Sequence, residues 1–260
     1  VCDQIIWGYL TTGKLDGGTN VADNDAGTLV DGKSYTTMEH YWDESFGYFG
    51  ASVDYLNLSN TNQRGAYDTD MSGSIDYKTE YNFDWAAYAA KRDDCTGCDH
   101  DGSFASTIMS AYIDGREAIT AGGGVSSYDP HRMTIVNTWE KVVAANIVHY
   151  ANSVQDDIAS GSSDLYKHWS ELRAFALALQ FNYYKVISDT DLTENDWIHI
   201  IDVFKREIKL SLGSEFPDDA EAQLWGGIEA VFKSWNGTRA INLSLIHISE
   251  PTRRRGISYA

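Results

Sequence analysis

Hydrophobic positions along the chain follow the period of a helix. The clearest case is the segment in which Asp129 is the expected N-cap and Pro130 the first helical residue, and in which Ile135, Trp139 and Val142 mark one apolar side. Other segments with this pattern are bounded by residues that start or stop helices. The expected helices span residues 4–12, 36–50, 81–91, 104–121, 129–158, 164–181, 193–212 and 217–235. About eight helices, without a convincing alternating segment, indicate an all-α protein of one or two packed bundles with long polar loops.

The segment 36–50 carries signals for both ends of a helix. Thr36 and Glu39 have the spacing of a capping box, in which two orphan backbone N–H groups are satisfied. Gly50 suits the left-handed conformation that commonly ends a helix. These residues predict a helix that starts directly after Thr36 and stops at Gly50.

Histidine and acidic residues share one face of this predicted helix. His40 and Glu44 lie one turn apart, and Asp43 is three residues from His40. Imidazole and carboxylate groups together suit zinc or iron, so these residues are candidates for a transition-metal site. The alternative is that the histidine is buried and hydrogen-bonded to its own acid, which locks the helix against its neighbours.

A later helix repeats part of this pattern. His168 and Glu171 are again three residues apart, and small and aromatic residues follow them. They could join His40 in the same metal site, and the match hints at a duplicated bundle with halves 1–121 and 129–242. His149 marks a third candidate polar face on the longest predicted helix.

The acidic segment 68–80 resembles an EF-hand calcium loop. Oxygen-bearing side chains alternate along it, and Gly73 permits the sharp turn of such a loop. In an EF-hand loop, the twelfth position carries an acid that binds calcium through both carboxylate oxygens. Here Thr79 occupies that position, and the acid Glu80 follows one residue later. The alternative is an acidic turn without an ion. The expected calcium ligands are Asp68, Asp70, Ser72, Ser74 through its carbonyl, Asp76 and Glu80.

Composition narrows the range of partners. The 260 residues carry a formal net charge of −18, which disfavours binding to nucleic acid and favours cations. The sequence has neither the His-Glu-x-x-His signature of zinc proteases nor a Gly-x-Ser-x-Gly nucleophile elbow. Metal ions are the expected partners, with an acidic surface that serves only solubility as the alternative, and no residue is assigned a catalytic role.

Cysteines and chain ends bear on the compartment. Cys95 and Cys98 lie in a polar loop, where a local disulfide in an oxidising compartment is preferred over free thiols. The segment 243–253 looks like a translated transposase adapter, so residues 243–260 are expected to be a non-native read-through. Without this tail, three Arg and one Glu are lost and the charge becomes −18 − 2 = −20. The start at Val1 suggests a helical domain of residues 1–242 that is truncated at its N-terminus.

The segment 39–50 resembles an uncharacterised bacterial envelope family that carries a domain of unknown function. The family signature is Glu-His-x-Trp-Asp-Glu-Ala-x-Gly-Tyr, and Ser45 stands here in place of the usual Ala. Segments 80–91 and 167–182 are similar to the same family. The resemblance implies an exported protein of the cell envelope, either periplasmic or an outer-membrane lipoprotein, with a lipid anchor on the missing N-terminus.

A more distant similarity is to imelysin-like proteins, which are iron-linked envelope proteins built from helical bundles. Their Gly-x-His-x-x-Glu motif would place its His on His40 and its Glu on Asp43, while Met38 departs from its Gly. This similarity implies an imelysin-like bundle, with a metal-dependent peptidase as the alternative activity. The expectation from the whole sequence is a non-catalytic envelope protein that binds calcium and a transition metal.

Overall fold

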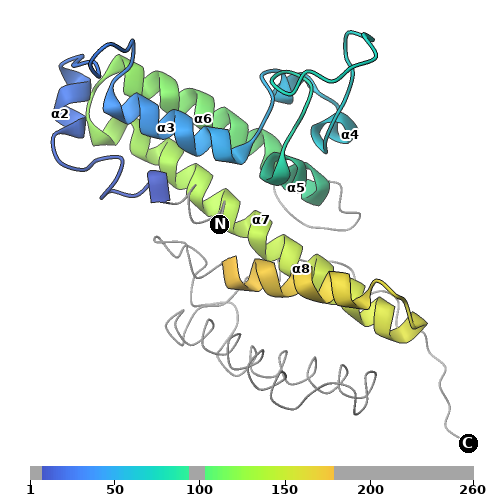
Figure 1. The fold of residues 1–260 in the computed structure, drawn as a ribbon. Helices are drawn as coiled ribbons and strands as arrows, with labels where there is room; N and C mark the ends of the chain where they lie inside the picture. The colour runs from blue at the N-terminus through green and yellow to red at the C-terminus, as the bar shows by residue number, and fades with distance from the viewer. Residues whose placement is uncertain (1–7, 94–102, 179–260) are drawn as a thin grey trace, which may run out of the picture.

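The computed structural model describes residues 8–93 and 103–178, drawn in colour in Figure 1. Within these ranges the chain is helical, and its only described sheet-like pairing is the isolated antiparallel bridge between Ala66 and Tyr81. The all-α prediction is confirmed. The described elements are α2 (Asn20–Asp25), α3 (Thr37–Phe49), η1 (Tyr55–Asn57), α4 (Asn60–Gln63), α5 (Asp84–Asp93), α6 (Phe104–Ala121), α7 (Val125–Ser160) and α8 (Leu165–Ala178).

Helix α7 forms the long axis of the described part of the chain. Helix α6 lies along its N-terminal half, α3 packs on α6, and α8 turns back along the C-terminal half of α7 (Figure 1). Gly161 ends α7 in the left-handed conformation, with φ of 66°, and so allows the reversal into α8. Helix α5 contacts both α6 and α7 near the middle of the axis.

An aromatic core joins these helices. The ring of Trp139 on α7 lies 4.5 Å from that of Trp85 on α5 and 5.8 Å from that of Phe49 on α3. Trp85 in turn meets Phe175 of α8 at 5.5 Å. Burial of each large apolar side chain contributes about 1.5–3 kcal/mol, so this chain of rings accounts for much of the packing between four helices.

Helix α3 begins and ends as predicted. The Thr36 hydroxyl accepts from the Glu39 N–H at 3.2 Å, and the Thr36 N–H donates to Glu39 Oε2 at 2.8 Å, which completes the capping box. Gly50 has φ of 79°, and a Cβ atom there would lie 2.8 Å from Cβ of Phe83. Glycine is thus needed at Gly50 both for its backbone conformation and for the close approach of the chain.

The predicted start of the longest helix was wrong. Helix α7 begins at Val125, and Pro130 lies inside it rather than at its first position. Asp129 also lies within α7 and therefore does not cap it; its carboxylate accepts from Nε of Arg132 at 2.8 Å. The early turn is held instead by Ser127, whose N–H and hydroxyl both donate to the carbonyl of Gly124.

Two other boundaries differ from expectation. The segment between the expected helices 4–12 and 36–50 contains the short helix α2, and α5 begins at Asp84 rather than at Tyr81. The predicted helices 193–212 and 217–235, Cys95, Cys98 and the tail 243–260 lie outside the described residues. The proposed duplication also rests largely on that part of the chain and stays a prediction. None of the described helices is long and apolar enough to cross a membrane.

Candidate calcium site

The acidic loop is closed at its base by backbone hydrogen bonds. The Tyr67 N–H donates to the carbonyl of Glu80 at 3.0 Å, next to the bridge between Ala66 and Tyr81. The Tyr67 hydroxyl also bonds the carbonyl of Thr79 and lies 2.9 Å from the hydroxyl of Ser52. These contacts fasten both ends of the loop to each other and to the segment that follows α3.

Backbone amides inside the loop orient its first two acids. Asp68 accepts from the N–H of Ser72 at 3.1 Å and from that of Gly73 at 2.8 Å. Asp70 accepts from the Ser72 N–H at 2.9 Å. Gly73 has φ of 81°, which makes the sharp turn that brings these amides back over Asp68. The residue types of the loop therefore produce the local geometry expected from their spacing.

Glu80 points back into the loop, although it lies one position beyond the usual ligand. Its Oε1 accepts from the Thr69 N–H and hydroxyl, each at 2.8 Å, and from the Asp70 N–H at 3.3 Å. Its Oε2 accepts from the Asp76 N–H at 3.1 Å. The Thr69 hydroxyl, followed by these backbone N–H groups, lowers the pKa of Glu80. The Ser72 N–H similarly lowers the pKa of Asp70.

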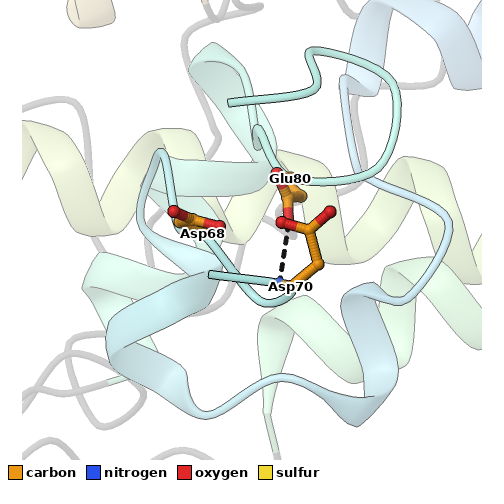
Figure 2. Close-up of side chains that lie close together, drawn as sticks. All are labelled: Asp68, Asp70 and Glu80. Carbon is orange, nitrogen blue, oxygen red and sulfur yellow. Dashed lines mark hydrogen bonds between the residues drawn. The ribbon is translucent and has the colours of Figure 1, made fainter. Parts of the chain in front are cut away.

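The three acids converge on one centre. Figure 2 shows Asp68, Asp70 and Glu80 around the same space, and one carboxylate oxygen of each lies within 4.8 Å of those of the other two. Calcium binds oxygen at about 2.3–2.6 Å, so two ligands on opposite sides of one ion are about 5 Å apart. One calcium ion could therefore contact all three acids. Among the described residues, no other group of three His, Cys, Asp or Glu side chains meets this criterion.

The other expected ligands are placed differently. The Asp76 carboxylate accepts from the Lys78 N–H at 2.8 Å and does not belong to the group of three. Ser72 donates its hydroxyl to the carbonyl of Ser74 at 3.1 Å, so these two oxygen-bearing residues face each other across the loop. Calcium coordination by Ser72, Ser74 and Asp76 stays a prediction.

No helix leads out of the acidic loop, contrary to expectation. Helix α5 begins only at Asp84, and a turn at the end of the loop brings Glu80 round instead. In this turn the Glu80 N–H donates to the carbonyl of Asp76 at 2.7 Å, and that of Thr79 donates to the same carbonyl at 3.2 Å. The loop thus shares the spacing of the first EF-hand ligands, but its final acid is one residue late and no helix directly follows it.

The candidate transition-metal residues on α3 have protein partners. His40 Nε2 lies 3.3 Å from Glu44 Oε1 on the surface, and the His40 ring stacks on that of Tyr35 at 5.1 Å. Asp43 faces away from this pair toward α6, where it accepts from Nε of Arg116 at 2.8 Å. His40, Asp43 and Glu44 therefore do not form one set of ligands.

The second candidate set is also divided. His168 on α8 pairs with Asp157 on α7, with 2.7 Å between Nδ1 and Oδ2. Oε2 of Glu171 is buried, and no hydrogen-bond partner reaches it within the described residues. The structure does not bring these side chains together with His40 around one centre. Binding of iron or zinc stays a prediction, with contacts that favour the structural alternative.

Comparison with known proteins assigns the chain to a family. Residues 1–210 match the family model of the domain of unknown function DUF4856. The chain belongs to the DUF4856 family. This confirms the expected membership of an uncharacterised family, while the envelope location and the imelysin-like link stay predictions. No solved structure matches this DUF4856 chain.

Short segments of the DUF4856 chain are similar to pyruvate, phosphate dikinases. The protein of Rhizobium meliloti is 48% identical over 59 residues, which cover 23% of this chain and 7% of the relative. That of Clostridium symbiosum is 44% identical over 54 residues, which cover 20% of this chain and 6% of the relative. The chain thus spans less than a tenth of these curated relatives, and the match does not extend to the activity of the whole dikinase.

A polar network missed by sequence reasoning gives partners to several residues of the segment 39–50 on α3. Arg116 of α6 donates to Glu39 at 2.7 Å and to Asp43 at 2.8 Å, and the Thr120 hydroxyl donates to Glu39 at 2.8 Å. Trp42 donates its indole N–H to the carbonyl of Tyr112 at 2.9 Å. No spacing in the sequence connects residues so far apart, so only tertiary structure could reveal these contacts.

Proposed function

We propose that this DUF4856 protein binds one calcium ion in the loop 68–80 and that the ion has a structural, non-catalytic role. The observation that carries the proposal is the position of Glu80. Its carboxylate turns back to share one centre with Asp68 and Asp70, although it lies outside the usual twelve-residue register. Hydrogen bonds from Thr69 and Asp76 hold it there.

The chemistry of the three acids supports calcium as the ion. Carboxylate, hydroxyl and carbonyl oxygens are the ligands of hard cations, and calcium accepts six to eight of them in flexible geometry. Magnesium requires a nearly ideal octahedron and keeps several of its waters. No described ion pair neutralises Asp68, Asp70 or Glu80, so three negative charges converge without a protein cation beside them.

The position of the loop supports a structural role. Asp68 and Asp70 lie near its beginning and Glu80 at its end, so one ion between them would fasten the two ends together. The Asn82 N–H next donates to the carbonyl of Gly65 at 3.1 Å, and α5 starts two residues later. Calcium would thus add to the contacts that hold α5 in the bundle, and it would stabilise the native state by binding it preferentially.

An exported location in the bacterial cell envelope belongs to the same proposal. The acidic surface and the resemblance of 39–50 to envelope proteins support it. Calcium sites of extracellular modules commonly have dissociation constants of about 10⁻⁴–10⁻³ M, a range that suits a compartment outside the cytosol. A lipid anchor would be carried by a sequence that precedes Val1.

Thermal unfolding in the presence of calcium or magnesium tests the proposal. At about one hundred times the dissociation constant, calcium should add about 2.7 kcal/mol of stability and raise the unfolding midpoint. Asp70→Asn should abolish most of this shift, since it removes a ligand charge. Asp54→Asn is the matched control, because Asp54 is an exposed acid that caps no helix with its side chain. If the unfolding midpoint of the wild-type chain does not change when calcium is added, the proposal is contradicted.

A metal-dependent peptidase, the alternative from the imelysin-like similarity, receives no comparable support. His40 is paired with Glu44 and stacked on Tyr35, while Asp43 binds Arg116. These partners suit side chains that orient α3 on the bundle surface. We therefore propose the calcium-binding function alone.

A further inference from the structure

Tyr77, Tyr81 and Phe83 form an exposed ring cluster at the end of the acidic loop. The centroids of the Tyr81 and Phe83 rings are 4.4 Å apart, and the Tyr77 ring lies 5.6 Å from Tyr81 and 6.4 Å from Phe83. Tyr77 is 68% exposed and Phe83 is 44% exposed. Single exposed apolar side chains are ordinary, but several in contact with one another indicate an interaction site.

Backbone contacts hold the ring cluster in place. Between Tyr81 and Phe83 lies Asn82, which is buried and whose Oδ1 accepts from the Ser52 N–H at 2.8 Å. The Phe83 N–H donates to the carbonyl of Gly50 at 2.8 Å. Asn82 therefore faces the end of α3, while the rings on either side of it are more exposed and contact each other. A surface held in one arrangement loses less conformational entropy when a partner binds.

Negative charge surrounds the ring cluster. Residues 68–84 include one basic residue, Lys78, and five acids, so their formal charge is 1 − 5 = −4. Asp76 and Asp84 are exposed, and they directly adjoin Tyr77 and Phe83 in the chain. The faces of aromatic rings also carry negative electrostatic potential. The charges and the rings therefore both favour a positively charged partner. The five acids are Asp68, Asp70, Asp76, Glu80 and Asp84.

Elsewhere in the structure, cations of the chain itself cover tyrosine rings. Nζ of Lys14 lies 4.2 Å from the centroid of the Tyr41 ring, and Nζ of Lys91 lies 4.8 Å from that of Tyr88. Within residues 8–93 and 103–178, no lysine or arginine covers a ring of the ring cluster in this way, although Lys78 lies next to it in sequence. These rings are therefore open to a cation from another molecule.

We propose that the ring cluster and the acids beside it bind an arginine side chain, presented by a basic peptide segment of another protein. A guanidinium is planar, so it stacks on an aromatic ring and still donates hydrogen bonds in its own plane to a carboxylate. It would lie on the exposed Tyr77 ring or Phe83 ring and donate to Asp84. This interaction goes beyond the calcium proposal, because neither the rings nor Asp84 are candidate calcium ligands.

Other partners match only part of this surface. A neutral sugar can stack on the rings, but it gains nothing from the negative charge around them. An apolar peptide would cover the rings and would leave Asp76 and Asp84 partly desolvated without a counter-charge, which is costly. The ammonium of lysine is a compact and strongly hydrated charge, whereas the weakly hydrated guanidinium suits both the rings and the acids.

A peptide titration followed by NMR tests this proposal on the full chain. The probe is acetyl-Arg-Gly-Arg-amide, and the control peptide has citrulline, a neutral side chain of the same shape, in place of each arginine. The titration is done in EDTA, so its outcome does not depend on calcium binding. We expect the arginine peptide to shift the backbone amide signals of Tyr77, Tyr81 and Phe83. It should bind about fivefold or more tightly than the citrulline peptide, and added salt should weaken it.

Variants separate this site from nonspecific attraction to an acidic protein. Tyr77→Leu keeps an apolar side chain without an aromatic face, and it should weaken binding of the arginine peptide about two- to fivefold. Tyr166→Leu is the matched control, because Tyr166 is 64% exposed on α8, and it should leave the affinity unchanged. The proposal is overturned if both peptides bind wild type equally, if maltotriose binds as tightly as the arginine peptide, or if the shifted signals all lie elsewhere.

Discussion

The carboxylate of Glu80 accepts a hydrogen bond from the backbone N–H of Asp70 at 3.3 Å, across ten residues of the acidic loop (Figure 2). This contact joins the end of the loop to its beginning. It also explains how an acid one residue out of register can still face the first two ligands. The geometry depends on a turn at Asp76 and needs no exiting helix.

Replacement of Glu80 by Gln should weaken calcium binding by about ten- to one-hundredfold. The amide keeps the shape of the side chain and one acceptor oxygen, but it loses the charge that the ion requires. Isothermal titration calorimetry of both chains measures the change. Glu117→Gln is the control, because Glu117 is exposed on α6. Equal affinities in wild type and Glu80→Gln would show that Glu80 only organises the loop backbone.

Substitution of Gly115 by Ala should destabilise the protein by about 1–3 kcal/mol. A Cβ atom at Gly115 would lie 2.2 Å from Cζ2 of Trp42, which is itself buried and bonded to Tyr112. Chemical denaturation measures the loss.

Gly47→Ala is the matched control for this substitution. Gly47 lies in the interior of α3, and a Cβ atom there would meet nothing within 4 Å. Alanine should stabilise the helix there by about 0.5–1 kcal/mol. Similar effects at Gly47 and Gly115 would contradict the close packing of α6 on Trp42.

Acid should destabilise the protein through Glu39 below about pH 4.5. Burial alone would raise the pKa of Glu39, but hydrogen bonds from Thr36, Thr120 and Arg116 outweigh it and lower that pKa. A carboxyl with a lowered pKa in the folded state contributes stability that is lost as pH falls toward that value. Glu39→Gln should cost about 1–3 kcal/mol at pH 7 and should flatten the pH dependence below 4.5. A variant whose stability matches wild type at pH 7 would contradict this role.

His149 should produce a second pH dependence in a higher range. Its pKa is lowered from 6.5 to about 4 in the folded state, so the unfolded chain binds more protons between these values. Stability should therefore fall as the pH decreases from about 6.5 to 4. His149→Gln should remove this slope and leave the Glu39 effect at lower pH unchanged. Denaturation at a series of pH values measures both, and a slope that persists in the variant would assign it to another group.

Local signals predicted the elements that local interactions define. The Thr36 and Glu39 pair marked the start of α3, and the glycines after Ala121 marked the end of α6. The start of α7 was missed because Asp129 resembles a cap, whereas in the structure Asp129 lies within α7 and accepts a hydrogen bond from Arg132, three residues later in the same helix. Asp129 shows that a residue type that is typical of helix N-caps can also lie inside a helix, where it bonds to a neighbour such as Arg132.

The candidate sites divide in the same way. The ligands of the acidic loop are close in sequence, so their spacing predicted the convergence of Asp68 and Asp70. The position of Glu80 required the turn that only the structure shows. A similar sequence pattern around His40 and His168 suggested that they share one site. In the structure, His40 pairs with Glu44 and His168 pairs with Asp157.

Calcium titration calorimetry on the full chain tests the central claim most directly. The account predicts one binding site per chain, with a dissociation constant in the range of about 10⁻⁴–10⁻³ M. It also predicts that the heat of calcium binding disappears in the Asp70→Asn variant and is retained in the Asp54→Asn variant. The absence of binding heat at millimolar calcium would contradict the account, since Glu80 would then serve only as an internal acceptor for Thr69 and Asp76.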